Sequence, residues 1–364
     1  MKKIFFVAGI IVIAIITGIF VINIYERDTE VTKETTKVGV ILNGTTDDHS
    51  WSQSHYEGLE QIAEELNLSV YYEENVTGEN ITQTIEGFAE NGCKIIIANS
   101  FEFGEYIHRA AKAYPEIYFF HATGVGEGKN LSTYFGRMYQ IRYLSGIVAG
   151  LQTKTNAIGY VAAFPISEVN RGINAFTLGV RSVNREAKVY VSWTNSWNDD
   201  TAAKEATEKL LGAHDIDVLA MHTDSIQPLE IAEQRGVMSI GYNVDNSEAY
   251  PDTYLTAAIW DWENFYKPHI LKCLQGKFEG HHYWEGVETG IVSLAPFTQN
   301  VEAGVEEIVK REMEKMHQGI FDVFYGPIYD NTGVLRVNEG ESITDAVMLN
   351  DFEWYVEGVV NDEK

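Results

Sequence analysis

Cysteine and basic residues are scarce in this sequence, and their scarcity narrows the possible functions. Cys93 and Cys273 are the only cysteines in 364 residues, and neither lies in a Cys-x-x-Cys pair or a His/Cys cluster. A zinc site is therefore not expected, and we predict two isolated buried thiols, with one disulfide as the alternative. The formal charge is −26, from 27 Lys and Arg against 53 Asp and Glu. Such a surface repels nucleic acid and anionic lipid, so we expect neither as a partner.

Sequence signatures of catalysis are absent as well. The chain has no G-x-S-x-G elbow and no G-x-x-x-x-G-K-[ST] loop, and the glycine-rich turn at 124–128 lacks the dinucleotide-binding spacing. The adjacent His281 and His282 are poorly placed to share a metal ion, because neighbouring residues on a strand point to opposite faces. Two Asp pairs, at 47–48 and 199–200, precede helical patterns and predict N-terminal caps. We therefore expect no enzyme, no cofactor and no metal.

The first 25 residues predict a membrane anchor. Lys2 and Lys3 precede an uncharged run, 4–25, that is rich in Ile and Val and long enough to span a bilayer. By the positive-inside rule, the N-terminus lies in the cytoplasm and the rest of the chain outside it. The run has no cysteine for lipoprotein acylation. We predict a signal anchor at 1–25 and a polar tether at 26–36, with a cleaved signal peptide as the alternative.

Two consecutive series of alternating strand and helix patterns follow. This alternation predicts mostly parallel sheets covered by helices. A polar break at 153–156 separates the series, so we expect two doubly wound, Rossmann-like α/β lobes facing a hinged cleft. The ligand-binding domain is 37–364, with the first lobe mainly 37–152, the second mainly 156–260 and the remainder crossing between them. The predicted strands are 38–42, 69–72, 94–98, 117–121, 131–134, 158–161, 188–193, 218–221, 238–242, 254–259 and 290–294. The predicted helices are 50–66, 80–91, 104–114, 138–151, 168–182, 200–211, 225–234, 262–276 and 301–316.

The stretch 47–59, D-D-H-S-W-S-Q-S-H-Y-E-G-L, opens the first helix. Ser50 and Gln53 fit a capping box, which predicts that the helix begins at Ser50. Trp51 and Ser52 are then its first residues, at the carboxyl end of a strand, where open α/β sheets bind ligands. An exposed indole is costly at such a place unless something stacks on it. We therefore interpret Trp51 as one wall of a small-molecule pocket.

Aromatic and polar residues also follow other predicted strands of both series. Paired flat rings suit a planar heteroaromatic ligand, and side chains that donate and accept hydrogen bonds distinguish one base from another. For any single Trp, core packing is the alternative, and for any single polar residue, capping or turn formation. The predicted ligand-binding residues are Trp51, Ser52, Phe101, Glu102, Trp197, Asn243, Asp245 and Trp260.

The motif D-x-S-[aromatic]-[NS]-Q-x-x-Y-E-G-L at 48–59 resembles the basic membrane protein (Bmp) family. Supporting motifs are A-N-S-F-E-F-G at 98–104, Y-L-S-G at 143–146, W-T-N-S-W at 193–197 and I-G-Y-N-V-D at 240–245. The resemblance covers about 37–358. It implies a receptor similar to type I periplasmic binding proteins, which binds purine nucleosides or bases and usually serves an ABC importer.

The resemblance also implies roles for single residues. Trp51 stands where the nucleoside receptors have a stacking Phe, Ser52 stands where they have a base-contacting Asn, and Trp197 is the opposing ring. Several positions depart from the ribose-binding pattern, namely Asn243 and Thr123 in place of Asp residues and Trp260 near an expected Lys. These departures weaken a ribose subsite, and S-F-E-F-G with W-T-N-S-W is similar to the adenine-binding branch. The resemblance therefore favours adenine over a nucleoside.

The sequence thus predicts an outward-facing purine-binding protein at the cell membrane that feeds an ABC permease. The absence of the usual lipid anchor leaves a membrane-anchored purine sensor or co-receptor as an alternative. A third alternative is a nucleosidase or deaminase on the same scaffold, which needs a carboxylate at the sugar or a metal-bound water.

Overall fold

A computed structural model describes residues 35–361 of the chain. The predicted anchor at 1–25 and nearly all of the predicted tether lie outside these residues. Within 35–361, no helix combines the length and the apolar character needed to cross a membrane.

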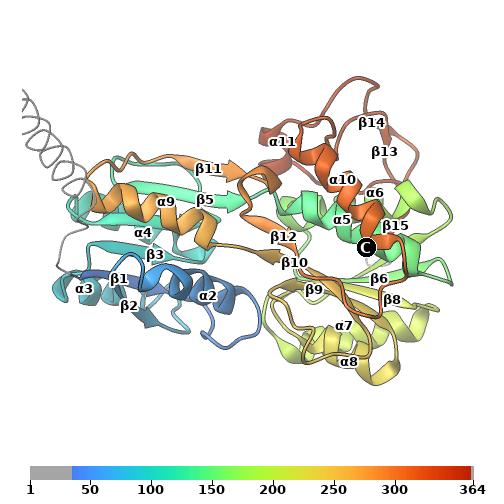
Figure 1. Cartoon of the computed structure of the whole chain (residues 1–364), viewed down its shortest axis with the longest axis horizontal. Helices are drawn as coiled ribbons and strands as arrows, with labels where there is room; N and C mark the ends of the chain where they lie inside the picture. The colour runs from blue at the N-terminus through green and yellow to red at the C-terminus, as the bar shows by residue number, and fades with distance from the viewer. Residues whose placement is uncertain (1–34, 362–364) are drawn as a thin grey trace, which may run out of the picture.

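Two sheets form the centres of two lobes that lie side by side (Figure 1). Their strands are parallel except for the antiparallel pairing of β10 with β12. The sheet of the first lobe has the order β11 (His282–Glu285), β5 (Leu131–Gly136), β4 (Tyr118–Ala122), β3 (Ile95–Ala98), β1 (Thr36–Ile41) and β2 (Leu68–Glu73). The sheet of the second lobe has the order β12 (Val292–Leu294), β10 (Tyr254–Trp260), β9 (Met238–Asn243), β8 (Val218–His222), β6 (Ala157–Ala162), β7 (Lys188–Trp193) and β15 (Val359–Asn361). The small strands β13 (Ile328–Tyr329) and β14 (Leu335–Val337) pair separately.

Helices cover both sheets, as the alternating pattern predicts. Those of the first lobe are α2 (Trp51–Ala63), α3 (Ile81–Glu90), α4 (Gly104–Ala113) and α9 (Glu263–Leu274), with the short 3-10 helix η1 (Phe101–Phe103). Those of the second lobe are α5 (Met138–Gln152), α6 (Ser167–Val183), α7 (Asp200–Ala213), α8 (Gln227–Arg235), α10 (Val305–His317) and α11 (Asp345–Asn350). The 3-10 helix η2 (Val287–Thr289) lies between β11 and β12.

The chain crosses between the lobes several times. It first crosses after β5, since α5 packs along α6 of the second lobe. The contact is close because both helices carry glycine there: a Cβ on Gly146 would lie 2.0 Å from the Phe176 oxygen, and one on Gly179 would lie 1.9 Å from the Tyr143 oxygen. The chain returns for α9 and β11 and crosses again to β12. Figure 1 shows α9, in orange, beside the blue and cyan elements of the first lobe.

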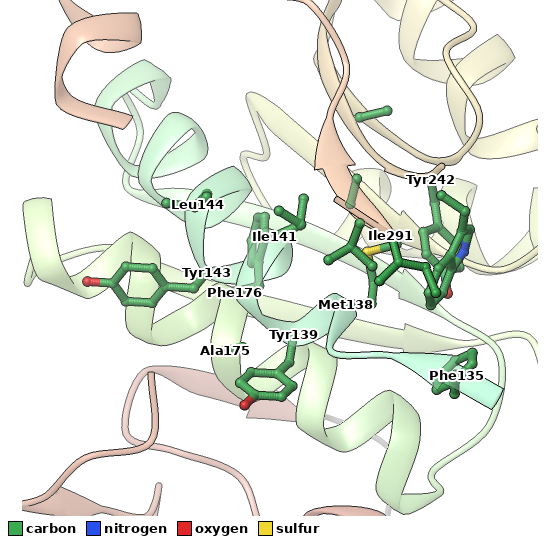
Figure 2. Close-up of a cluster of buried hydrophobic side chains, with 14 of the residues drawn as sticks. Phe135, Met138, Tyr139, Ile141, Tyr143, Leu144, Ala175, Phe176, Tyr242 and Ile291 are labelled. Carbon is green, nitrogen blue, oxygen red and sulfur yellow. The ribbon is translucent and has the colours of Figure 1, made fainter. Parts of the chain in front are cut away.

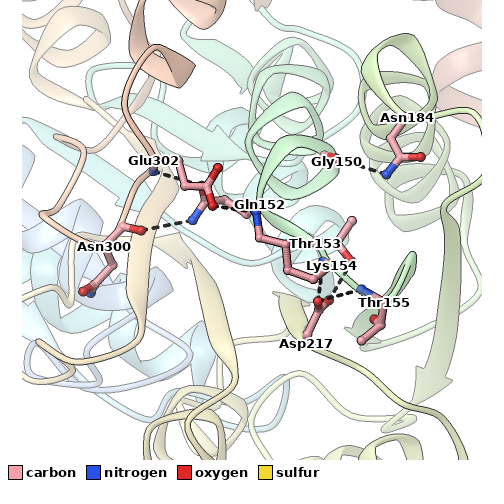
Figure 3. A network of polar contacts seen from close by, with 9 residues as sticks. All are labelled: Gly150, Gln152, Thr153, Lys154, Thr155, Asn184, Asp217, Asn300 and Glu302. Carbon is pink, nitrogen blue, oxygen red and sulfur yellow. Dashed lines mark hydrogen bonds and ion pairs between the residues drawn. The ribbon is translucent and has the colours of Figure 1, made fainter.

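The polar break after α5 is an ordered turn. The Asp217 carboxylate accepts hydrogen bonds from Thr153 Oγ1 at 2.6 Å, from the Lys154 backbone N–H and from the Thr155 backbone N–H at 3.0 Å (Figure 3). The amide of Gln152 donates to the Asn300 carbonyl at 3.0 Å and accepts from the Glu302 N–H at 2.9 Å. These bonds fix the segment before α10 to the end of α5.

One hydrophobic cluster contains buried side chains from both lobes. Part of it surrounds α5, where Met138, Ile141 and Leu144 lie near Phe176 of α6 (Figure 2). Cys93 and Cys273 are both buried and free, as expected. The prediction of two α/β lobes is confirmed.

Candidate functional site

The start of α2 is held by Asp48 rather than by Ser50. The Asp48 carboxylate accepts from the backbone N–H groups of Ser50 at 2.8 Å, Ser52 at 2.9 Å and Gln53 at 3.0 Å. The Gln53 side chain accepts from the N–H of His49 at 3.0 Å. The helix begins at the predicted place, but the capping box on Ser50 is wrong, because the Ser50 hydroxyl makes no cap bond. That hydroxyl is free to contact the second lobe.

Trp51 is buried rather than exposed, which corrects the sequence expectation. Its side chain is 8% exposed, and its indole N–H donates to the Asn99 carbonyl at 2.8 Å. The ring packs edge-on against Trp260 at 5.7 Å, Trp262 at 5.6 Å and Phe135 at 6.3 Å. The expected stacking partner is thus supplied by the protein's own aromatic residues. We call Trp51, Trp260 and Trp262 the tryptophan cluster.

Asn243 joins the two lobes. It ends β9 with a positive φ of 73°, a conformation that Asn tolerates better than most residues. Its amide nitrogen donates to Ser50 Oγ and to an oxygen of Asp224, both at 2.8 Å, and its amide oxygen accepts from the Trp260 indole N–H at 2.9 Å. The Asn246 amide adds a second link, donating to the His49 carbonyl at 3.1 Å. These contacts hold the lobes together.

The other predicted site residues divide into buried and surface groups. Ser52 is fully buried, and its hydroxyl accepts from the Gly44 N–H at 3.1 Å and the Asn99 amide at 3.2 Å. It therefore orders the loop after β1. Phe101 is 68% exposed, and Glu102 and Asp245 are also exposed. The structure does not bring these three surface residues to the tryptophan cluster.

Trp197 lies in the second lobe, half-buried, with ring contacts to Phe164 at 5.9 Å and His222 at 6.1 Å. Its carbonyl accepts from the N–H of Asp224 at 2.7 Å, so it is one residue away from the Asn243 network. In this arrangement Trp51 and Trp197 each pack on other rings instead of sandwiching one space.

A small cavity lies between the neighbours of these two tryptophans. In this arrangement its free volume is about 10 Å³, room for about one water molecule and far below the usual size of a ligand pocket. Phe135, which touches Trp51, and His222, which touches Trp197, both line it. Figure 2 shows Phe135 at the end of β5 and Tyr242 from β9 in the same buried cluster as Met138 of α5. The full lining is Phe135, Met138, Tyr139, Arg142, Glu168, Arg171, Gly172, His222 and Tyr242.

Two carboxylates face each other at the junction of the lobes. Burial raises the pKa of Asp224 well above its ordinary value, and the nearby Asp48 raises it further, while the hydrogen bond from Asn243 opposes the shift. Burial also raises the pKa of Asp48, against the three backbone N–H groups that it caps. Burial and the nearby Asp48 therefore favour the protonated, neutral form of Asp224 beside the Asn243 network.

Sequence reasoning missed most of the cavity lining. Arg142, Glu168 and Arg171 lie on helices and were absent from the predicted site, which was built from strand ends. A detectable signal was Arg142, the one charged residue in the run 138–151. A charged residue that is fully buried needs a partner or a function.

Two α/β lobes, joined by several crossing segments with polar and aromatic residues at their junction, define the class of two-lobed type I periplasmic binding proteins. Solved structures agree with this fold. A transcriptional activator of the comK gene from Bacillus halodurans matches with a TM-score of 0.70 and 25% identity, over 78% of this chain and 99% of that one. A D-allose-bound solute-binding protein from Actinobacillus succinogenes matches with a TM-score of 0.57 and 13% identity, over 76% and 100%; this second match supports the fold alone.

The chain belongs to the Bmp family of ABC transporter substrate-binding proteins, whose PnrA-like model matches residues 35–321. A purine-binding protein of Brucella abortus is 32% identical over 330 residues, or 90% of this chain and 93% of that protein. A Haloferax volcanii protein named "Putative ABC transporter glucose-binding protein TsgA13" is 34% identical over 327 residues, or 90% and 81%. The resemblance inferred from the sequence motifs is thereby confirmed at the level of the family.

Proposed function

We propose that this protein binds a purine between its two lobes, outside the cytoplasm, and delivers it to an ABC permease. The observation that carries the proposal is the cavity at the lobe junction, whose lining touches Trp51 through Phe135 and Trp197 through His222. The purine-binding relative from Brucella abortus supports the choice of ligand.

The proposed site combines aromatic rings with hydrogen-bonding groups from both lobes. Trp51 and Trp260 lie on one side with Asn243, and Trp197 lies on the other. Once hinge opening frees a face of two rings, stacking of roughly 1–3 kcal/mol per base and a few hydrogen bonds would supply about 8 kcal/mol, or micromolar affinity. Hinge opening would widen the small cavity enough to admit the base, and closure would restore the Asn243 bonds.

The resemblance to the adenine-binding branch makes adenine the first candidate to test. The same ligand site serves the alternative output, in which a membrane-anchored sensor passes the signal to another membrane protein. A deletion of the partner permease distinguishes the two, since only transport requires the pore for purine uptake.

Calorimetric titration of the full chain, kept in a mild detergent because of the predicted anchor, tests the proposal. The panel is adenine, hypoxanthine, adenosine, guanosine and glucose, the last being included because of the Haloferax volcanii relative. We expect micromolar binding of at least one free base and weaker binding of the nucleosides. Binding of glucose without any purine contradicts the proposal. Release of free base during long incubation with adenosine would support the nucleosidase alternative instead.

A further inference from the structure

Two residues that line the second-lobe side of the cavity, Arg142 and His222, carry buried polar atoms without partners. Arg142 is fully buried, and its Nη1 donates to the Met221 carbonyl at 2.7 Å. Its guanidinium lies 3.9 Å from the centre of the Tyr242 ring. Its Nε and its Nη2 have no hydrogen-bond partner. An unpaired buried donor costs about 1–3 kcal/mol, and more when the group is charged.

His222 adds another unpartnered atom to the same cavity. The ring is 2% exposed, and Nδ1 lies 3.2 Å from the Tyr160 hydroxyl, whereas Nε2 has no partner. Burial lowers the pKa of His222 well below its ordinary value, and the positive charges of Arg142 and Arg171 lower it further. His222 is therefore neutral, and it lines the cavity with one ring nitrogen unpaired.

Charged neighbours set the electrostatics of this space. Arg171 and Glu168, both from the start of α6, line the cavity with Arg142. Burial raises the pKa of the Glu168 carboxyl, whereas Arg171 and Arg142 oppose that shift. Two arginines and one glutamate thus line the cavity, so its charged side chains are mainly cationic.

Nε and Nη2 of an arginine form the edge that binds two adjacent acceptors in parallel. We propose that this edge of Arg142 binds the O6 and N7 acceptors of a 6-oxopurine, such as hypoxanthine, and that the protein therefore prefers 6-oxopurines to adenine. The inference rests on the proposed function, since it assumes that a purine occupies the cavity. Arginine reads guanine in DNA through the same pair of acceptors. Adenine presents an amine at position 6, so a donor would meet a donor and one buried N–H would stay unpaired.

Glu168 fits the same ligand. A 6-oxopurine carries a proton on N1, next to the keto group, and the Glu168 carboxyl lines the cavity as an acceptor for it. The exposed Glu102, by contrast, makes no approach to the cavity in this arrangement, although the adenine prediction relied on its segment. The choice between adenine and hypoxanthine is therefore a direct test.

The test compares ligands that differ in single atoms, by calorimetry on the full wild-type chain in detergent. Hypoxanthine should bind at least about tenfold more tightly than adenine, and about tenfold more tightly than 7-deazahypoxanthine, which lacks the N7 acceptor. These two comparisons need no variant and so cannot fail through misfolding. Adenine binding that equals or exceeds hypoxanthine binding overturns the inference while leaving the proposed function intact. Failure of every purine to bind overturns both.

Variants of Arg142 provide a second test of whether this residue binds the purine edge. Arg142→Lys keeps the charge but cannot offer two parallel donors, and Arg142→Met keeps the length without donors. Both should lose the preference for hypoxanthine over adenine, because hypoxanthine loses two contacts with Arg142 whereas adenine loses the one at N7. If both variants weaken the two bases equally, or if the preference persists, Arg142 does not read the purine edge and the inference is wrong.

Discussion

The two sides of the lobe junction differ in how their polar groups are paired. On the side of the tryptophan cluster, each indole N–H has an acceptor: Trp51 donates to Asn99, Trp260 to Asn243 and Trp262 to Ser54. On the second-lobe side, Arg142 keeps two N–H groups without partners and His222 keeps one nitrogen. Both sides are almost completely buried.

This difference indicates that one side of the junction mainly stabilises the fold and the other mainly selects the ligand. The three indole N–H groups of the tryptophan cluster are paired without a ligand, and Nε2 of the adjoining His55 is the one buried ring nitrogen there without a partner. The cluster therefore contributes mainly stability and shape. The second-lobe side is left with unmet donors, and a ligand that supplies acceptors would relieve their cost. Specificity should then reside mainly on the second-lobe side, and substitutions on the two sides should separate stability from ligand choice.

The largest expected effect is that of Trp51→Ala. Removing a buried Trp that contacts Trp260, Trp262 and Phe135 should lower the free energy of unfolding by about 3–5 kcal/mol. Purine affinity should also fall at least tenfold, because the cluster supports the proposed site. Urea unfolding followed by circular dichroism measures the first quantity and calorimetry the second.

The matched control is Trp197→Ala on the second-lobe side. Trp197 is half-buried, so its loss should cost about 1 kcal/mol of stability, while purine binding should weaken as it does for Trp51→Ala. Equal destabilisation by the two substitutions would remove the proposed difference between the sides. Unchanged purine binding in Trp51→Ala would exclude that residue from the site.

Asn243 connects the two sides, so the next prediction concerns Asn243→Ala. The change leaves the Trp260 N–H, the Asp224 carboxyl and the Ser50 hydroxyl without their shared partner, which should cost about 2–4 kcal/mol. Asn243→Gly removes the same bonds but suits the φ of 73°, so it should be about 1 kcal/mol less destabilising. Denaturant unfolding measures both variants.

Small-angle X-ray scattering measures whether the two lobes separate in these Asn243 variants. Both Asn243 variants should have a larger radius of gyration than the wild-type chain, because the Ser50 contact holds the lobes together. A glycine variant as stable and as compact as the wild type would show that the side chain does not link them.

The alternation of patterns was enough to predict the helices and strands of both lobes up to residue 274. Each of these elements has its own amphipathic period or β-branched run, so local sequence determines it. The elements β11, β13, β14, β15 and α11 and the 3-10 helices η1 and η2 were not predicted. Most are two to four residues long and form by pairing with distant partners, as β15 does with β7, and such pairing leaves no periodic signal.

The candidate site was predicted less completely, for a related reason. Trp51, Asn243 and Trp260 do come together, because they follow or end strands of the two sheets where the lobes meet. Phe101, Glu102 and Asp245 also follow strands, yet their side chains point to solvent. Strand ends locate a loop but do not set the direction of a side chain. The crossing of α5 into the second lobe, which places Arg142 at the cavity, depends on tertiary packing against α6.

His55 offers a smaller, pH-dependent test of the tryptophan side. It stacks on Trp262 at 4.5 Å with Nδ1 2.5 Å from the Tyr266 hydroxyl, and burial lowers its pKa to about 3 from an ordinary value of 6.5. The unfolded chain therefore takes up a proton near pH 6.5 that the folded chain resists. The stability contributed by neutral His55 is complete above pH 6.5 and is lost as the pH falls toward 3.

Between pH 7 and pH 5, this single residue should lower the free energy of unfolding by about 2 kcal/mol. In His55→Gln, the pH dependence over that range should be weaker than in the wild type by the same amount, whatever the variant's stability at pH 7. The exposed His317→Gln is the matched control. Identical pH dependence in His55→Gln and the wild type would mean that His55 is not held neutral by burial in the tryptophan cluster.

The smallest expected change in stability is that of Arg142→Met, although this is a substitution of a fully buried charged residue. Losing the bond to the Met221 carbonyl and the contact with Tyr242 should cost about 1–3 kcal/mol. Removing two buried N–H groups that have no partner should stabilise the fold by a similar free energy. The free energy of unfolding should therefore change by less than about 1 kcal/mol, a small fraction of the cost of Trp51→Ala. A loss above about 3 kcal/mol would mean that the Arg142 guanidinium supports the fold as the indoles do, and the two sides of the junction would then no longer differ in kind.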